Sequence, residues 1–109
     1  MVAVSVLMSA VRADAYLATA IESILGQSFE DFEFVIVDDS GTGEVASFAR
    51  RYRDSRLQLI VNEANLGLTA SLVRGSDACL GTYIARMDAD DIARRDRLER
   101  QVRFLESHP

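Results

Sequence analysis

Three aspartates, Asp88, Asp90 and Asp91, stand within four residues of one another directly after an apolar stretch. Unpaired carboxylates this close repel one another, and each favours hydration. Hard divalent cations such as Mg²⁺ or Mn²⁺ bind carboxylate oxygens and keep open positions for substrate phosphates and water. The spacing therefore predicts a divalent cation site that can hold a diphosphate. The alternative is a helix cap, since Asp90 or Asp91 would favour the amino end of a following helix.

A second polar group, Asp38 and Asp39, follows another apolar stretch. An ionised carboxylate only accepts hydrogen bonds, so this pair suits a ligand that presents a donor, such as the imide N–H of a pyrimidine. The alternative is a turn, or a cap for a helix that begins near Glu44. The turn at 65–67 has the same two interpretations: Gly67 supplies a positive φ, and Asn65 serves as a cap or as a ligand contact.

Short apolar stretches and amphipathic stretches alternate along the chain. The pattern predicts strands at 2–8, 32–37, 57–61 and 82–87. Four amphipathic helices are predicted between and after these strands, because apolar residues recur there at helical spacing. Their apolar faces are Leu17, Ile21, Ile24 and Leu25; Val45, Phe48, Ala49 and Tyr52; Leu72, Val73, Cys79 and Leu80; and Leu98, Val102 and Leu105. We expect Asp14 to cap the first helix and Gly26 to close it in a left-handed conformation. Cys79 is expected to fill the core.

This alternation predicts an α/β fold, in which a Rossmann-like, mostly parallel sheet carries helices on both faces. Ligands bind such sheets outside the carboxyl ends of the strands. Four loops should therefore form the binding edge, at 9–14, 38–43, 62–67 and 88–91.

Composition excludes several classes of protein. The chain has 109 residues, enough for one domain, and 17 acidic against 12 basic residues give a net charge of −5, which disfavours nucleic-acid binding. Every basic residue is arginine, so a P-loop and a Schiff-base lysine are excluded. One cysteine and one histidine cannot form a zinc cluster or an internal disulfide. The longest apolar run is too short to span a bilayer and lacks signal-peptide features, so we expect a cytoplasmic protein.

In this order and spacing, the motifs resemble the amino-terminal half of a family 2 glycosyltransferase with the GT-A fold. The matching stretches are 4–8, 16–17, 20–25 with Gln27 and Phe29, 31–39, 65–68, 81–91 and 96–102. The resemblance runs from about residue 2 to residue 109. It implies transfer of a sugar from a nucleoside diphosphate donor to an acceptor, generally with inversion at the anomeric carbon.

The resemblance also implies roles for individual residues. Asp39 would accept from uracil or another base, with Ser9 and Val11 beside it. Asp90 would bind Mg²⁺ or Mn²⁺ bridging the diphosphate, with Asp91 as a secondary ligand, and Asp88 would contact the ribose or the metal shell. Asn65 and Arg74 would lie nearer the nucleotide and phosphates, although Arg74 equally suits a solvated position on a helix.

Two departures from the family pattern change what is expected of this chain. The first loop reads Ser9-Ala10-Val11-Arg12 where the family usually has proline, an aromatic residue and asparagine, so a stacking surface for the base is missing. In the family the chain continues beyond this point, and the catalytic base lies in that further part. Residues 1–109 are therefore expected to form a donor-binding half that binds a nucleotide sugar, most readily of the UDP type, and transfers nothing by itself.

The resemblance further implies work in bacterial cell-envelope or polysaccharide synthesis, with the full-length protein at the inner face of the membrane. An exposed sheet edge would favour a homo-oligomer. The alternatives are a non-catalytic nucleotide-binding or oligomerisation module on the same fold, a phosphorylated receiver domain and a sugar nucleotidyltransferase. The last two normally use a lysine that this chain lacks.

Overall fold

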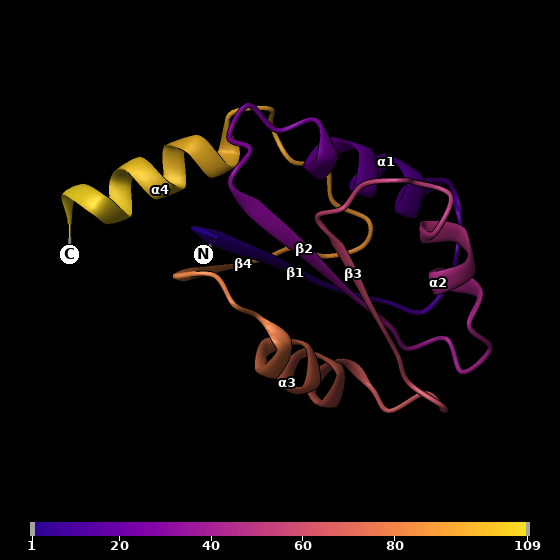
Figure 1. The fold of residues 1–109 in the computed structure, drawn as a ribbon. Helices are drawn as coiled ribbons and strands as arrows, with labels where there is room; N and C mark the ends of the chain where they lie inside the picture. The colour runs from indigo at the N-terminus through magenta and orange to yellow at the C-terminus, as the bar shows by residue number, and fades with distance from the viewer. Residues whose placement is uncertain (1, 109) are drawn as a thin grey trace.

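Strands and helices alternate through the computed structural model, which describes residues 2–108 (Figure 1). The elements are β1 (Val4–Ala10), α1 (Ala15–Leu25), β2 (Phe32–Asp38), α2 (Glu44–Ala49), β3 (Leu57–Val61), α3 (Leu68–Ala78), β4 (Tyr83–Arg86) and α4 (Arg97–Ser107). The four strands form one sheet in the order β3-β2-β1-β4, and every neighbouring pair is parallel. The α/β prediction is confirmed.

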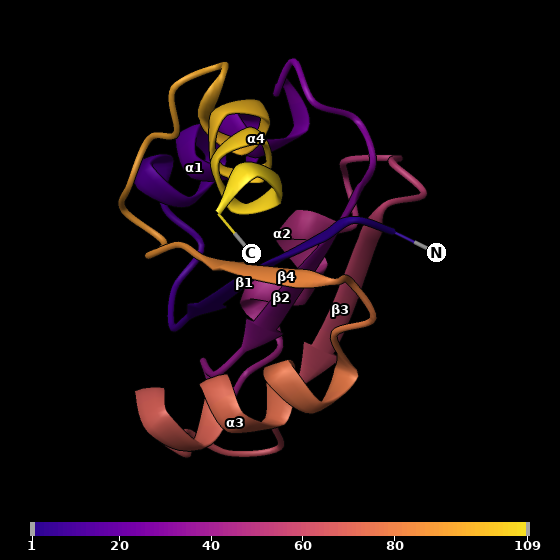
Figure 2. The ribbon, with the colours of Figure 1, turned by 90° about the vertical axis from the view of Figure 1, so that its left-hand side faces the viewer.

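Helices cover both faces of the sheet, as predicted. Figures 1 and 2 show α3 on one face and α1, α2 and α4 on the other. The larger core lies on the three-helix side, where α1, α2 and α4 bury Leu17, Ile21, Ile24, Val45, Leu98 and Val102 against Val6, Met8, Phe34 and Ile36 of the two central strands. The smaller core lies under α3 and contains Leu7, Val35 and Val37, with Leu72 and Cys79 packed against them. Cys79 is thus core filler, as expected.

Helix α3 differs from the prediction in its length and in its buried face. It ends at Ala78, so Leu80 lies outside the helix and is 76% exposed, and Val73 is exposed as well. The buried positions are Ser71 and Gly75. A Cβ atom on Gly75 would lie 2.4 Å from Leu7 Cδ1, so the glycine lets the helix approach the sheet closely. Apolar periodicity missed this face because its residues are small.

The predicted cap at the amino end of α1 is present, but the predicted conformation at its carboxyl end is not. Asp14 Oδ1 accepts the backbone N–H of Leu17 at 3.0 Å, which confirms the amino-terminal cap. Gly26 ends the helix by donating its N–H to Glu22 O at 3.0 Å. Its φ of −90° is not left-handed, so that part of the prediction was wrong. Helix α2 ends at Ala49, and Tyr52 follows it instead of lying within it.

Strand β4 lies at one edge of the sheet and pairs only with β1 among residues 2–108. Self-association through this edge stays a prediction. No helix within the described part of the chain is long and apolar enough to cross a membrane.

Candidate functional site

The carboxyl ends of the strands place the predicted loops along one edge. Ala10 of β1 pairs with Asp38 of β2, which pairs with Val61 of β3, so these three strands end level with one another. Arg86 of β4 pairs with Leu7, and continuing this register brings Asp88 level with Ser9. Ser9 itself was expected in a loop but belongs to β1, because that strand extends to Ala10.

Asp38 has a structural role, which was the simpler of the two interpretations of the acidic pair. Its Oδ2 accepts the backbone N–H of Ala46 in the first turn of α2 at 2.9 Å. Its Oδ1 accepts from the backbone N–H of Ser40 at 2.9 Å and from the Ser40 hydroxyl at 2.6 Å. Asp38 therefore caps α2 and closes the turn after β2.

Asp39 is 1% exposed and organises the loop that follows β3. Its Oδ1 accepts from Leu66 N at 2.7 Å and from the side-chain amide of Asn62 at 2.9 Å, while its Oδ2 accepts from Gly67 N at 3.0 Å. Burial by itself raises the pKa of Asp39, but these donors, together with Ser71, outweigh burial and hold the pKa below its ordinary value. Asp39 is thus a buried, ionised carboxylate at the carboxyl end of β2.

Three other residues singled out in the sequence lie in this loop or contact it. The side-chain amide of Asn65 donates to the backbone oxygen of Asp39 at 3.0 Å. Gly67 has the expected positive φ, at 91°. Arg74 Nη1 donates to Asn62 Oδ1 at 2.5 Å and to Val61 O at 3.0 Å, so its guanidinium is anchored at the end of β3 instead of being only solvated.

The three aspartates after β4 gather in one turn. Asp91 N donates to Asp88 O at 3.1 Å, and one carboxylate oxygen from each of Asp88, Asp90 and Asp91 lies within 4.8 Å of the others. All three side chains are exposed, and Arg86 Nη2 lies 3.5 Å from Asp88 Oδ1. Three converging carboxylate oxygens open to solvent are the hard donor set that Mg²⁺ and Mn²⁺ take.

The alternative role of these aspartates as helix caps is excluded by where α4 begins. The helix starts at Arg97, with Asp96 at its N-cap position. The N–H of Leu98 in its first turn is instead bound by Gln27 Oε1, at 3.0 Å. Asp90 and Asp91 therefore lie in a separate loop that precedes the helix.

An open pocket of about 540 Å³ joins the first loop to the acidic loop. It is lined by Val11, Arg12, Asp14, Tyr16, Ala89 and Asp90. Val11 is 47% exposed, so the position where the family usually has an aromatic residue is accessible. The pocket brings Val11 and Asp90 together, whereas Asp39 and Asn65, which the resemblance placed with Val11 around the base, are not among its lining residues. The backbone N–H of Asp39 donates to the oxygen of Ala10, the residue before Val11, at 2.8 Å.

Sequence reasoning missed Asn62 and Ser71, which are both buried. Asn62 donates from its side chain to Asp39 and to Ser71 Oγ, each at 2.9 Å. The available signal was position, because Asn62 directly follows β3 at the edge where ligands bind. Sequence reasoning chose Asn65 in the same loop because it belongs to the recognisable Asn-Leu-Gly turn.

Comparison with known proteins agrees with this geometry. The family model described as glycosyl transferase family 2 matches residues 5–109. EpsE of Bacillus subtilis (strain 168), a protein assigned to the glycosyltransferases, is 42% identical over 108 residues. That match covers 96% of this chain and 39% of EpsE. The O-antigen biosynthesis glycosyltransferase WbnJ of Escherichia coli is 34% identical, over 94% of this chain and 41% of WbnJ. The chain therefore spans less than half the length of these relatives.

Solved structures share the fold. Residues 1–349 of S. aureus TarS superpose with a TM-score of 0.89 at 24% identity, over 97% of this chain and 33% of that one. TarS has also been solved in complex with UDP-GlcNAc. The mannosyltransferase PcManGT of Pyrobaculum calidifontis, solved with GDP-Man and Mn²⁺, superposes with a TM-score of 0.81 at 24% identity, over 94% of this chain and 32% of that one. With the family model covering nearly the whole sequence, the chain belongs to glycosyl transferase family 2 and has a GT-A fold.

Proposed function

We propose that residues 1–109 form the donor-binding half of a glycosyltransferase and bind a nucleoside diphosphate sugar together with Mg²⁺ or Mn²⁺. The observation that carries this proposal is the turn in which Asp88, Asp90 and Asp91 bring carboxylate oxygens within 4.8 Å of one another. The turn follows β4 at the edge where Asp39 follows β2. This edge is the usual ligand site of a parallel sheet.

A bound divalent cation would neutralise the diphosphate and stabilise the negative charge of the leaving nucleotide. Asp90, with Asp88 and Asp91 beside it, would hold the cation. The base would lie toward Asp39, with Ser9 and Val11 at the carboxyl end of β1, and Asn65 and Arg74 would lie nearer the nucleotide and its phosphates. UDP is the first ligand to test because TarS has been solved in complex with UDP-GlcNAc and in complex with UDP. GDP is the second, because PcManGT was solved with GDP-Man.

Catalysis needs a base that deprotonates the acceptor hydroxyl, and the proposal assigns none to this chain. The acceptor site is proposed to belong to the further length of chain that the relatives have. The isolated chain is therefore expected to bind donor and to transfer no sugar.

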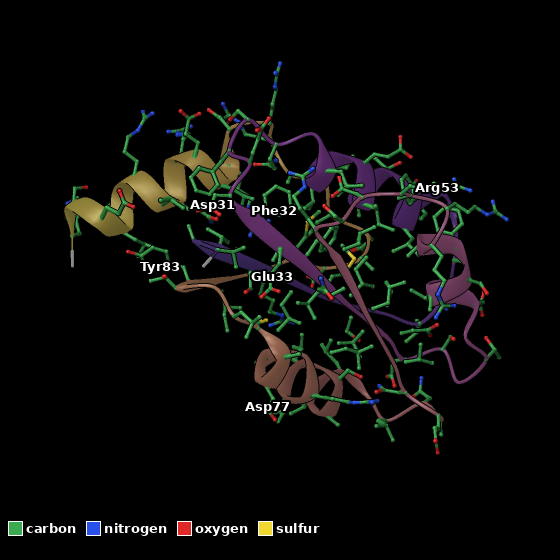
Figure 3. All side chains as sticks on the ribbon, in the orientation of Figure 1. Asp31, Phe32, Glu33, Arg53, Asp77 and Tyr83 are labelled. Atoms are coloured by element: carbon green, nitrogen blue, oxygen red, sulfur yellow. The ribbon has the colours of Figure 1, made fainter. Side chains whose placement is uncertain are left out.

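Calorimetric titration with UDP, with and without Mn²⁺, tests this function. Wild type should bind UDP only with Mn²⁺, and Asp90→Ala should lose that binding. Asp77→Ala is the matched control, because Asp77 is an exposed carboxylate in the last turn of α3, away from the carboxyl ends of the strands (Figure 3). Absence of binding to UDP and to GDP by the folded wild type would contradict the proposal. Binding that Asp90→Ala retains would contradict the assigned metal site.

A further inference from the structure

One buried amide connects the two charged residues that the proposed function places near the nucleotide. Asn62 is 1% exposed and directly follows β3. Its Nδ2 donates to Asp39 Oδ1 at 2.9 Å, and its Oδ1 accepts from Arg74 Nη1 at 2.5 Å. Asn62 thus lies between the carboxylate of Asp39, which directly follows β2, and the guanidinium of Arg74 on α3.

The chemistry of these neighbours fixes the orientation of the amide. A carboxylate can only accept and a guanidinium can only donate, so the NH₂ group must face Asp39 and the oxygen must face Arg74. The second amide hydrogen is used by Ser71 Oγ at 2.9 Å. The backbone N–H of Asn62 donates to Asp38 O at 2.9 Å, which continues the β2–β3 pairing. Both ends of the side chain are therefore occupied, and the residue has little freedom to turn.

Asparagine is the residue type that meets all these demands at this position. Aspartate would place a second carboxylate beside Asp39 and would remove two donors. Leucine would leave the Arg74 contact and one acceptor site of Asp39 without their partner. The amide therefore sets the position of the Asp39 carboxylate relative to the Arg74 guanidinium, in addition to joining β3 to α3.

We propose that Asn62 is a positioning residue for nucleotide recognition, which holds Asp39 and Arg74 in the arrangement that receives the nucleotide of the donor. This inference rests on the proposed function, because it assumes that the edge binds a nucleotide. Asn62 acts through its two neighbours, and the metal-binding turn at 88–91 does not depend on it. Its loss should weaken binding of the nucleotide while leaving binding of the cation unchanged.

The test uses two ligands and two variants of the whole chain. Affinity for UDP is measured by calorimetry at saturating Mn²⁺, and affinity for Mn²⁺ alone by electron paramagnetic resonance. Asn62→Asp and Asn62→Ala should each bind UDP about tenfold more weakly than wild type, the scale of losing a hydrogen bond to a charged group. Both should bind Mn²⁺ within about twofold of wild type, while Asp90→Ala loses both ligands.

Glu33→Gln separates a loss of positioning from a loss of stability. Glu33 is also buried and accepts from Ser5 Oγ at 2.5 Å and from Leu80 N at 2.6 Å, but it lies near the amino end of β2 (Figure 3). This variant should unfold more easily and bind UDP as wild type does.

Three outcomes would overturn the inference. The first is wild-type UDP affinity in folded Asn62→Ala, and the second is an equal loss of UDP and Mn²⁺ affinity, which indicates general loosening. The third is that both Asn62 variants are unfolded even in the cold, since the residue would then serve the fold alone. Failure of wild type to bind UDP overturns the proposed function itself and is recognised before any Asn62 variant is compared.

Discussion

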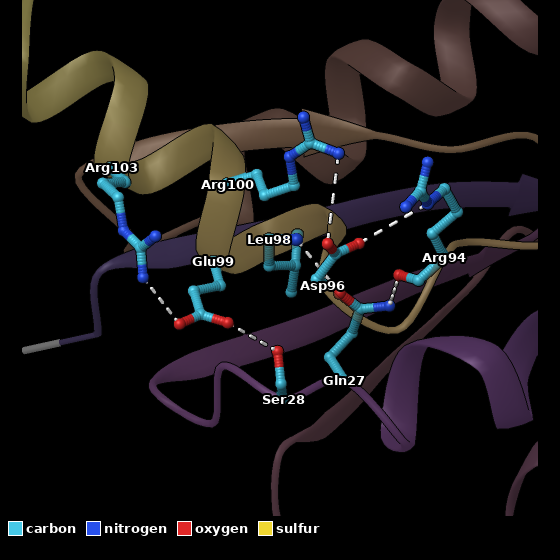
Figure 4. Close-up of polar contacts among 8 residues, drawn as sticks. All are labelled: Gln27, Ser28, Arg94, Asp96, Leu98, Glu99, Arg100 and Arg103. Carbon is cyan, nitrogen blue, oxygen red and sulfur yellow. Dashed lines mark hydrogen bonds and ion pairs between the residues drawn. The ribbon is translucent and has the colours of Figure 1, made fainter.

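The side-chain oxygen of Gln27 accepts the backbone N–H of Leu98 at 3.0 Å and so caps a helix that begins 70 residues later in the chain. Gln27 is 5% exposed, and its Nε2 donates to Arg94 O at 2.6 Å (Figure 4). The same Nε2 also donates to Ser23 O at 3.0 Å. Ser23 Oγ also accepts the N–H of Ala93 at 3.0 Å. The end of α1 therefore holds the segment between the acidic turn and α4 in place.

Gln27→Ala should lower the free energy of unfolding by about 1–3 kcal/mol, because it leaves the buried N–H of Leu98 without a partner. Urea denaturation followed by circular dichroism measures the change. Gln101→Ala is the control, since Gln101 is an exposed glutamine on α4, and it should stay within about 0.5 kcal/mol of wild type. Equal stability of the two variants would mean that water replaces Gln27 at the start of α4.

The alternation of strands and helices could be predicted because it depends on local periodicity. The bounds of β3 were predicted correctly, since Leu57–Val61 is a continuous apolar-rich stretch between polar turns. The buried face of α3 could not be read in this way, because Ser71 and Gly75 carry no apolar signal. Gly75 is packed against Leu7 and Val37, and Ser71 accepts from the buried side chain of Asn62.

The edge that carries the candidate site was predictable, but its hydrogen bonds were not. Parallel topology places Asp39 and Asp88 at the carboxyl ends of strands whatever their partners are. That Asp38 caps α2 while Asp39 binds the loop at 62–67 depends on how that loop folds. The cap that Gln27 provides for α4 likewise requires contacts between residues far apart in the sequence, which a local pattern does not contain.

The buried carboxylate of Asp39 predicts a loss of stability in acid. Its pKa is below the ordinary value of 3.8 because its hydrogen-bond donors outweigh the effect of burial, so the unfolded state binds protons first. Its contribution to stability is present above the unfolded pKa and is lost as the pH falls through the folded pKa.

Urea denaturation between pH 7 and pH 2.5 should therefore show stability falling below about pH 5. Asp39→Asn should be less stable than wild type at pH 7 and should lose less stability on acidification. Asp54→Asn should also flatten the acid limb, because hydrogen bonding from Arg56 lowers the pKa of Asp54 against the effect of burial. If Asp39→Asn lost as much stability in acid as wild type, the Asp39 carboxyl would have the same pKa in the folded and unfolded states.

The raised pKa of Tyr52 predicts a loss of stability at alkaline pH. Burial, with the hydrogen bond that its hydroxyl donates to Glu22 Oε2 at 2.7 Å and the charge of Glu22, raises its pKa to about 12 from 10.0. The folded state therefore keeps this proton longer than the unfolded state does. Its contribution to stability is complete below pH 10 and is lost as the pH rises toward about 12.

Spectrophotometric titration at alkaline pH, combined with urea denaturation between pH 8 and pH 11.5, tests this effect. Tyr52→Phe should reduce the alkaline fall in stability. Glu22→Gln should retain part of it, because the amide oxygen still accepts the hydrogen bond while the charge is removed. If Tyr52→Phe lost as much stability at alkaline pH as wild type, that loss would come from groups other than Tyr52.

Position 11 gives the sharpest test of how the base is bound. Val11 follows β1, is 47% exposed and lines the pocket that also contains Asp90. Base–aromatic stacking contributes about 1–3 kcal/mol in nucleic-acid sites, and a valine offers no aromatic face. Val11→Tyr should therefore tighten UDP binding by about tenfold at saturating Mn²⁺. Its affinity for Mn²⁺ alone should not change, since the substitution adds no ligand for the cation.

Val11→Ala is the matched control, because it changes the size of the side chain without adding a ring, and its UDP affinity should stay within about twofold of wild type. Calorimetry with UDP and with uridine separates stacking from diphosphate binding: Val11→Tyr should improve both, because the gain comes from the base. Tighter UDP binding without tighter uridine binding would indicate that the tyrosine hydroxyl contacts the phosphates. Unchanged affinity for both ligands would place the base away from the end of β1, toward the loop that Asp39 and Asn62 hold together.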